Sequence, residues 1–299
     1  MRELVREIAQ KSPATVIKEQ EPLARYTSFK IGGPSELFLQ PQASAEIPRL
    51  LDLVRRYEVP LHILGGGSNL LVSDTGVRGV VLKIGCGDVA RAGENGLRAD
   101  AGCQKAAVAL YAQRAGLAGL AFLHGIPGTL GGGVLMNAGA YGGELSQVVA
   151  RVTACDRHGC VQTFDGAALG FGYRRSVFQE RRDLTVLSAE LSLTPEDPAE
   201  IRACMEELMA RRRERQPLEY PSAGSTFKRP EGHFAGKLIE DCGLKGYTVG
   251  GASVSEKHAG FVINHGGATC EDVRRVIEHI QETVLRAFGV ELACEIEMW

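Results

Sequence analysis

The twenty residues 124–143, HGIPGTLGGGVLMNAGAYGG, restrict what this chain can fold into more than any other segment does. Eight of them are glycine, and the apolar residues among them follow neither the 3.6-residue repeat of a helix nor the two-residue repeat of a strand. Glycine adopts positive φ and lets a ligand lie directly against backbone N–H and C=O groups. The segment is therefore predicted to hold a large, flat or phosphate-bearing cofactor.

The overall composition is typical of a soluble globular protein. Apolar residues make up 44% and charged residues 23%, and a formal net charge of −2 gives no electrostatic case for binding nucleic acid or a membrane surface. No apolar run is long enough to cross a bilayer, and the N-terminal MRELVREIAQK indicates an amphipathic helix and not a secretory signal. The eight cysteines are scattered singly, so no metal site is predicted. We expect a cytoplasmic monomer.

Helical and strand patterns mix without strict alternation, which predicts an α+β fold. We expect an N-terminal helical segment 1–20, a domain 21–194 with lobes 21–84 and 85–194, and a C-terminal domain 195–299. In the last domain, Thr269 and Asp272 predict a capped helix whose apolar stripe runs from Val273 to Phe288. The main expected elements are helices in 43–59, 104–117, 199–215 and 233–242, strands in 36–40, 61–64, 70–72, 79–84, 97–101 and 183–193, a hairpin over 148–164, and a final strand over 292–299.

A second glycine cluster follows the strand predicted over 61–64, in the sequence GGGSN (65–69). The chain has no G-x-x-x-x-G-K-[ST] motif, which excludes a P-loop. The cluster also runs into strand-like NLLV where a Rossmann loop needs a helix. Two separate glycine segments suit a bulky ligand with a pyrophosphate in its middle; two mobile surface loops are the plain alternative.

The motifs GGGSNLLV (65–72) and GIPGTLGGGVLMNAGAYGGE (125–144) resemble the FAD-binding half of the vanillyl-alcohol-oxidase-like flavoproteins. The more distal motifs YRRSVF (173–178), YPSAGSTFKRP (220–230), GGASVSEKHAGFVIN (250–264) and LACEIEMW (292–299) resemble the UDP-N-acetylenolpyruvoylglucosamine reductase family in its shorter, type II form. The resemblance implies a two-lobed FAD-binding domain followed by a smaller α/β substrate-binding domain. It also implies noncovalent FAD, NADPH as reductant, and a UDP-sugar enolpyruvate as substrate, which is reduced to UDP-N-acetylmuramate for peptidoglycan.

The resemblance also assigns site residues. Arg174 matches the family's carboxylate-binding arginine, with Arg175 beside it as the obvious misassignment. Ser225 matches the proton donor and Glu295 the catalytic glutamate, although strand spacing alone does not separate Glu295 from Glu291 or Glu297. Candidate cations for the UDP diphosphate are Arg213, Arg215, Lys228 and Arg229. The expected FAD contacts are Gly65, Gly66, Gly67, Ser68, Asn69, Gly125, Ile126, Pro127, Gly128, Thr129, Gly132, Asn137, Ala138, Gly139, Ala140 and Tyr141.

Two other functions share the glycine segments. Another FAD-dependent oxidase or dehydrogenase of the same superfamily would have both segments but would not require Arg174, Ser225 and Glu295 together. A flavin-binding module without turnover would need none of the three. The yellow colour and spectrum of a bound flavin would separate all of these from a protein that binds no flavin.

Overall fold

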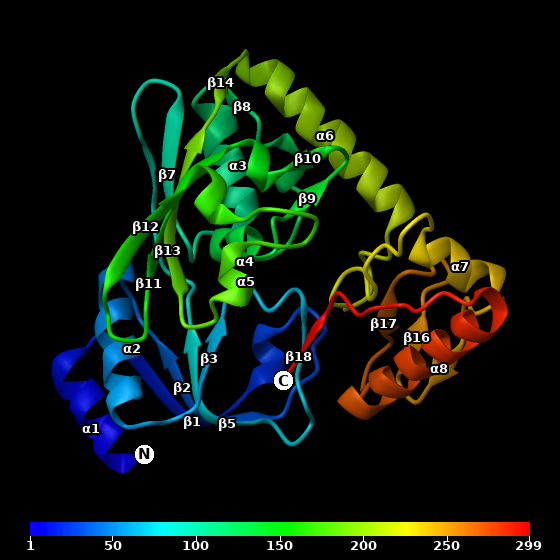
Figure 1. Cartoon of the computed structure of the whole chain (residues 1–299), viewed down its shortest axis with the longest axis horizontal. Coiled ribbons are helices and arrows are strands. Elements are labelled where there is room, and N and C mark those ends of the chain that lie inside the picture. Colours follow the sequence, from blue (N-terminus) through cyan, green and yellow to red (C-terminus); the bar gives the residue numbers. More distant parts are fainter. The chain divides into compact units, whose positions relative to one another are not determined.

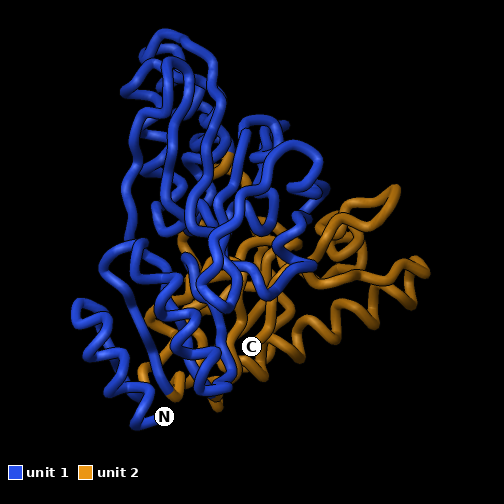
Figure 2. The backbone as a smooth tube through the Cα atoms, turned by 60° about the vertical axis from the view of Figure 1, so that its left-hand side comes forward, with its two compact units in different colours: residues 1–19, 37–66, 79–211 blue, residues 20–36, 67–78, 212–299 orange.

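The computed structural model describes all 299 residues, and they form two compact units that are each discontinuous in sequence (Figure 2). Unit 1 comprises residues 1–19, 37–66 and 79–211, and unit 2 comprises residues 20–36, 67–78 and 212–299. Because both units are discontinuous in sequence, they do not test the domain boundary predicted near Thr194, which stays a prediction. No helix combines the length and the apolar character that crossing a membrane requires.

Most of the regular structure belongs to unit 1 (Figure 1). Strands β1, β2 and β5 and helix α6 cross the sequence boundary between the units. The helices are α1 (Arg2–Lys11), α2 (Ile47–Arg56), α3 (Lys105–Arg114), α4 (Leu130–Leu135), α5 (Val177–Glu180) and α6 (Pro198–Arg215). The strands are β1 (Val16–Pro22), β2 (Pro34–Gln40), β3 (Leu61–Leu64), β5 (Val77–Lys83), β6 (Val89–Arg91), β7 (Gly96–Asp100), β8 (Leu117–Ala118), β9 (Gly139–Ala140), β10 (Gly143–Glu144), β11 (Val149–Cys155), β12 (Val161–Asp165), β13 (Thr185–Ser192) and β14 (Thr194–Pro195).

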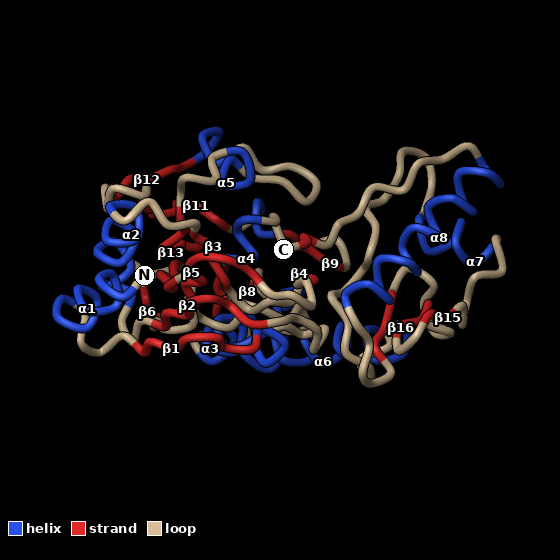
Figure 3. The backbone as a smooth tube through the Cα atoms, turned by 90° about the horizontal axis from the view of Figure 1, so that it is seen from below, coloured by secondary structure: helices blue, strands red, loops and turns tan.

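Two larger sheets organise these strands, one with the order β1-β2-β5-β3 and one with the order β12-β11-β13-β7-β6. Helices α1 and α2 lie side by side, at one side of the first sheet (Figure 3). The hairpin predicted over 148–164 is confirmed, because β11 and β12 pair antiparallel. Its turn is closed by Asp156, whose Oδ1 accepts hydrogen bonds from the backbone N–H groups of His158 at 2.8 Å and Cys160 at 2.9 Å.

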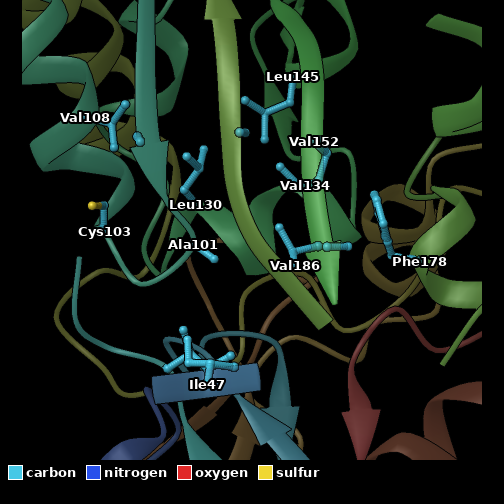
Figure 4. Close-up of a cluster of buried hydrophobic side chains, with 14 of the residues drawn as sticks. Ile47, Ala101, Cys103, Val108, Leu130, Val134, Leu145, Val152, Phe178 and Val186 are labelled. Carbon is cyan, nitrogen blue, oxygen red and sulfur yellow. The ribbon is translucent and has the colours of Figure 1, made fainter. Parts of the chain in front are cut away.

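The glycine-rich segment contains a helix that its pattern did not predict. Helix α4 has the sequence LGGGVL, and the Thr129 hydroxyl caps it by accepting from the N–H of Gly132. Its buried side chains, Leu130 and Val134, belong to the same apolar cluster as Val152 and Val186 of the five-stranded sheet (Figure 4). A glycine disfavours a helix by about 1 kcal/mol relative to alanine, so tertiary packing and the cap override local propensity here.

Gly131 of α4 is explained by how closely the helix backbone approaches a neighbouring segment. A Cβ at Gly131 would lie 2.7 Å from the Cβ of Ala101, whereas a Cβ at Gly132 would meet only the Thr129 hydroxyl, at 3.6 Å. The N–H of Gly131 also donates to the carbonyl of Ala101 at 2.9 Å. Close approach at Gly131 thus fixes the helix against the end of β7.

Unit 2 contains a long helix packed on a small antiparallel sheet. Helix α8 runs alongside β16 and β17, with α7 next to it (Figure 1). The sheet has the order β15-β16-β17, and β18 pairs parallel with β4. The elements are β4 (Leu70–Leu71), α7 (Ala235–Asp241), β15 (Thr248–Val249), β16 (Ala252–Val254), β17 (Val262–Asn264), α8 (Cys270–Phe288) and β18 (Glu297–Met298).

The start of α8 confirms the predicted capping box. The Thr269 hydroxyl accepts from the N–H of Asp272, and the Asp272 carboxylate accepts from the N–H of Thr269, both at 3.0 Å. The stripe from Val273 to Val284 is buried, but Phe288 is 44% exposed, so its inclusion in the core was wrong. Phe288 is the last residue of the helix, where Gly289 reverses the chain in the left-handed conformation.

Two further expectations differ from the structure. The N-terminal helix ends at Lys11, and β1 begins at Val16, so the helix does not extend over the whole segment 1–20. The final strand is limited to Glu297–Met298, and residues 292–296 lie outside it. Local alternation of apolar and polar residues could not reveal that this segment changes its hydrogen-bonding partner partway along.

The packing of α4 leads to a stability prediction for two adjacent glycines. Gly131→Ala should lower the free energy of unfolding of the cofactor-free protein by about 1–3 kcal/mol, because the added Cβ overlaps Ala101. Gly132→Ala should leave it unchanged or raise it by up to about 1 kcal/mol, because its Cβ has room and alanine favours the helix. Urea denaturation followed by circular dichroism measures both, and equal effects of the two substitutions would contradict this packing.

Candidate functional site

Two glycine segments were predicted from the sequence, and we call residues 65–69 the first and residues 124–143 the second. They contact each other in unit 1, at Gly65 and Gly66 of the first segment. A Cβ at Gly66 would lie 2.4 Å from the Cα of Gly128, and a Cβ at Gly65 would lie 2.6 Å from the Thr129 hydroxyl. A side chain at Gly66 would force the two backbones apart, whereas one at Gly65 would displace the Thr129 hydroxyl. Gly66 is therefore needed for backbone-to-backbone contact, in addition to any approach by a ligand.

Several backbone donors remain unused at this contact. The N–H groups of Gly65, Gly66, Gly128 and Thr129 donate to no acceptor within the chain. The second segment is nevertheless held firmly, because the N–H of Lys105 donates to the Gly128 carbonyl at 3.0 Å. Neighbouring N–H groups without partners form a concave binding site for an anion such as a pyrophosphate.

Lys83, at the end of β5, supports the first glycine segment and was missed by the sequence analysis. Its Nζ donates to the carbonyl of Gly65 at 2.6 Å. Burial lowers the pKa of the Lys83 ammonium. A half-buried cation bound to a loop carbonyl both fixes the loop and adds positive potential beside the unpaired N–H groups. The only available signal was a lysine directly after the apolar run Val80–Leu82.

The far end of the glycine-rich segment is fixed by Asn137, which is buried and has a φ of +42°. Its Nδ2 donates to the carbonyl of Gly172 at 3.0 Å, and its Oδ1 accepts from the N–H of Ser146 at 2.9 Å. Tyr141 forms the turn between β9 and β10 with a φ of +56°, and the guanidinium of Arg211 lies 5.1 Å from its ring centre. Both side chains thus have structural contacts in addition to any contact with a cofactor.

Arg174 lies in a tight turn that is attached to the same segment. Gly172 and Arg175 exchange two backbone hydrogen bonds of 3.1 Å, which places Arg174 in the left-handed region at a φ of +52°. Its Nη2 donates to the Gly139 carbonyl at 3.4 Å. Gln179 donates to the Arg174 carbonyl at 3.0 Å. The Arg174 side chain is therefore directed along the glycine-rich segment.

Arg175 has a different environment, although it is adjacent in sequence. It is exposed, and its Nε donates to Glu180 at 2.9 Å. A carboxylate already pairs with its guanidinium, so the side chain is a surface ion-pair partner. The sequence motif favoured Arg174, and the ion pair of Arg175 adds a physical reason for that choice.

In unit 2, backbone hydrogen bonds bring the segments of Ser225 and Glu295 together. The N–H of Glu295 donates to the carbonyl of Thr226 at 2.8 Å. The N–H of Thr226 donates to the Gly260 carbonyl at 2.9 Å. This bond anchors residues 221–227, which we call the serine loop, to the segment before β17. Ser225 and Glu295 are both half-buried. The structure thus joins two residues that lie seventy positions apart in the sequence.

The first glycine segment also contributes to this part of unit 2. Asn69 Nδ2 donates to the Glu295 carbonyl at 3.0 Å. The N–H of Ser28 donates to the Gly67 carbonyl at 3.1 Å, and the Ser28 hydroxyl donates to the Ser222 carbonyl at 2.6 Å. Ser28 was not singled out from the sequence, because a serine in a turn is uninformative by itself.

The four candidate cations of unit 2 are all exposed. Lys228 and Arg229 directly follow the serine loop, and the guanidinium of Arg229 lies 3.9 Å from the ring centre of Phe234. Arg213 and Arg215 lie in the last turn of α6, where the Arg213 carbonyl accepts from Lys257 at 2.7 Å. Exposure is compatible with a role in diphosphate binding but does not select among the four.

In comparisons with known proteins, the two glycine segments fall in one family model, and Ser225 and Glu295 fall in another. Residues 35–165 match the family model for an FAD binding domain, and residues 216–299 match the model for the C-terminal domain of UDP-N-acetylenolpyruvoylglucosamine reductase. The reductase of Agathobacter rectalis is 46% identical and covers 98% of this chain and 97% of its own length. The reductase of Caldanaerobacter subterraneus is 49% identical over 93% of this chain and 92% of its own length. The crystal structure of the Thermus caldophilus reductase is similar with a TM-score of 0.81 and 33% identity, covering 95% of this chain and 99% of that one.

The contact of Lys83 leads to a prediction about cofactor affinity. Lys83→Met removes the donor to the Gly65 carbonyl, and we expect the dissociation constant for FAD to rise about tenfold, as for a lost charge-assisted hydrogen bond. Titration of the apoprotein with FAD by flavin fluorescence measures this. Lys11→Met is the control, because Lys11 is exposed and pairs with Glu7. Unchanged affinity in Lys83→Met would exclude a role for Lys83 in supporting the site.

Proposed function

The chain belongs to the UDP-N-acetylenolpyruvoylglucosamine reductase family and is an FAD-dependent oxidoreductase; we propose that NADPH is its reductant and the enolpyruvyl group of UDP-N-acetyl-3-O-(1-carboxyvinyl)-glucosamine its substrate. The product would be UDP-N-acetylmuramate, a peptidoglycan precursor. The observation that carries the proposal is the order of the matched domains, with an FAD-binding domain followed by the reductase C-terminal domain. We further propose that the protein works as a monomer in the cytoplasm.

The glycine segments are suited to hold FAD. The unpaired N–H groups of Gly65, Gly66, Gly128 and Thr129 can donate to its pyrophosphate, supported by the cation of Lys83. FAD held there would supply hydride-transfer chemistry, with NADPH as the proposed source of the hydride. The other contacts expected in the second glycine segment lie between Gly125 and Tyr141.

The chain's own residues must then meet three requirements. Hydride addition to the methylene carbon places negative charge on the adjacent carbon and its carboxylate. A cation must bind that carboxylate, a polar group must stabilise the enolate, and an acid must deliver a proton to the carbon.

We assign carboxylate binding to Arg174, because its planar guanidinium can hold both oxygens at once. Proton delivery is assigned to Ser225, which directly follows Gly224 at a φ of +81°. A serine is a weak acid, but an enolate carbon is a strong enough base to take its proton. Glu295 is assigned to stabilise the enol, and its backbone is already tied to the serine loop.

Anaerobic stopped-flow spectroscopy tests the whole proposal. NADPH should bleach the flavin absorbance, and the enolpyruvyl sugar nucleotide should restore it, with UDP-N-acetylmuramate as the product. Failure of the nucleotide to reoxidise a flavin that NADPH does reduce would point to a different substrate. A purified protein that neither contains nor binds FAD would overturn the assignment altogether.

Ser225→Ala should separate the two half-reactions. We expect flavin reduction by NADPH to change less than twofold, whereas reoxidation by the substrate slows about a hundredfold or more, the scale of a lost general acid. Ser222→Ala is the matched control from the same loop, since its hydroxyl accepts only a weak 3.4 Å hydrogen bond from Gly224. Equal losses in both half-reactions of Ser225→Ala would mean that the serine is structural.

The two adjacent arginines give a second matched comparison. Arg174→Ala should lower kcat/KM for the sugar nucleotide about a hundredfold, because the substrate carboxylate loses a bidentate partner. Arg175→Ala should change it less than twofold, because Arg175 pairs with Glu180 at the surface. Steady-state kinetics at fixed NADPH measures both, and a larger loss from Arg175→Ala would reverse the assignment.

A further inference from the structure

The C-terminal segment changes its hydrogen-bonding partner at Glu295. Before that point it pairs with residues 226–228, since the N–H of Lys228 donates to the Ala293 carbonyl at 2.8 Å and the N–H of Glu295 donates to the Thr226 carbonyl at 2.8 Å. After it, the N–H of Glu297 donates to the Asn69 carbonyl at 2.9 Å. Glu295 is thus the residue at which one backbone pairing ends and the other begins.

The parallel pairing of β4 and β18 begins at Glu297, two residues after Glu295 in the sequence. In the observed register Leu70 lies opposite Glu297, so a continued parallel ladder would bring the backbone N–H of Asn69 to the Glu295 carbonyl. Instead the Asn69 side chain donates to this carbonyl at 3.0 Å, and the Asn69 backbone N–H has no acceptor within the chain. A side-chain amide therefore takes the place of the missing ladder bond.

We propose that Asn69 is a positioning residue whose side-chain amide, by holding the Glu295 carbonyl, sets the direction of the Glu295 side chain. This role differs from the cofactor contact that its place in GGGSN suggests, and it rests on the proposed function of Glu295. The N–H of Glu295 is fixed by Thr226, so the bond from Asn69 to its C=O restrains the residue from both sides. Displacement of a reacting group by about 1 Å can slow a reaction up to about a hundredfold.

Asn69→Ala and the isosteric Asn69→Asp, which lacks the N–H donor, test the proposal in the FAD-loaded enzyme and in the apoprotein. We expect reoxidation by the sugar nucleotide to slow tenfold or more, while flavin reduction by NADPH and the dissociation constant for FAD change less than threefold. In the apoprotein, amide hydrogen exchange in residues 293–299 should become about fivefold faster, because one restraining hydrogen bond is lost. Asn69→Asp guards against a general packing defect in Asn69→Ala.

Ser73→Ala is the matched control. Ser73 follows the other end of β4, and its hydroxyl bonds only to Thr75, so both exchange and reoxidation should stay at wild-type values. Weaker FAD binding with equal losses in both half-reactions would overturn the proposal and make Asn69 a cofactor contact. Wild-type exchange and kinetics in both Asn69 variants would also overturn it. If the wild-type enzyme itself fails to reduce the sugar nucleotide, the proposed function fails, and hydrogen exchange alone still decides whether Asn69 restrains Glu295.

Discussion

The backbone contact between Gly66 and Gly128 is the constraint on which the rest of unit 1 depends. Because a Cβ at Gly66 would lie 2.4 Å from the Cα of Gly128, any side chain there would separate the two segments. Their separation would move the unpaired N–H groups of the two segments apart. Asn137, which follows α4, donates to the Gly172 carbonyl at 3.0 Å and so ties the turn that carries the candidate arginine to the second glycine segment.

In unit 2, backbone hydrogen bonds arrange the segments that carry the candidate groups. These segments contain little regular secondary structure. The serine loop, the first glycine segment and residues 292–296 lie outside the named strands, yet each provides carbonyls that the others or their neighbours use. A fixed backbone leaves the short side chain of a serine few directions to point in, and it fixes the point from which the longer side chain of a glutamate extends. Such rigidity is what proton transfer to a carbon centre requires, because its geometry tolerates little displacement.

The parts of the fold that were predictable are those in which local sequence and tertiary packing agree. The capping box of Thr269 and Asp272 and the hairpin turn at Asp156 are formed by neighbours in the chain, so the structure confirms both. Helix α4 was missed because its three glycines oppose helix formation locally, whereas its packing against β7 and β13 stabilises the helix. For the site, motifs pointed to Arg174, but only the ion pair of Arg175 with Glu180 gives a physical reason to separate the two arginines.

The amino-acid sequence alone was sufficient to indicate an α+β protein with two glycine-rich segments, an FAD cofactor and the family to which the chain belongs, because each of these is a matter of residue types at short spacing. Tertiary structure alone decided which residues support the candidate groups. Lys83 holds Gly65, Ser28 holds Ser222, and Asn69 holds Glu295 across 226 positions of the sequence. No periodicity or motif encodes such bonds, since each depends on where two distant stretches of backbone come to lie once the apolar cores have packed.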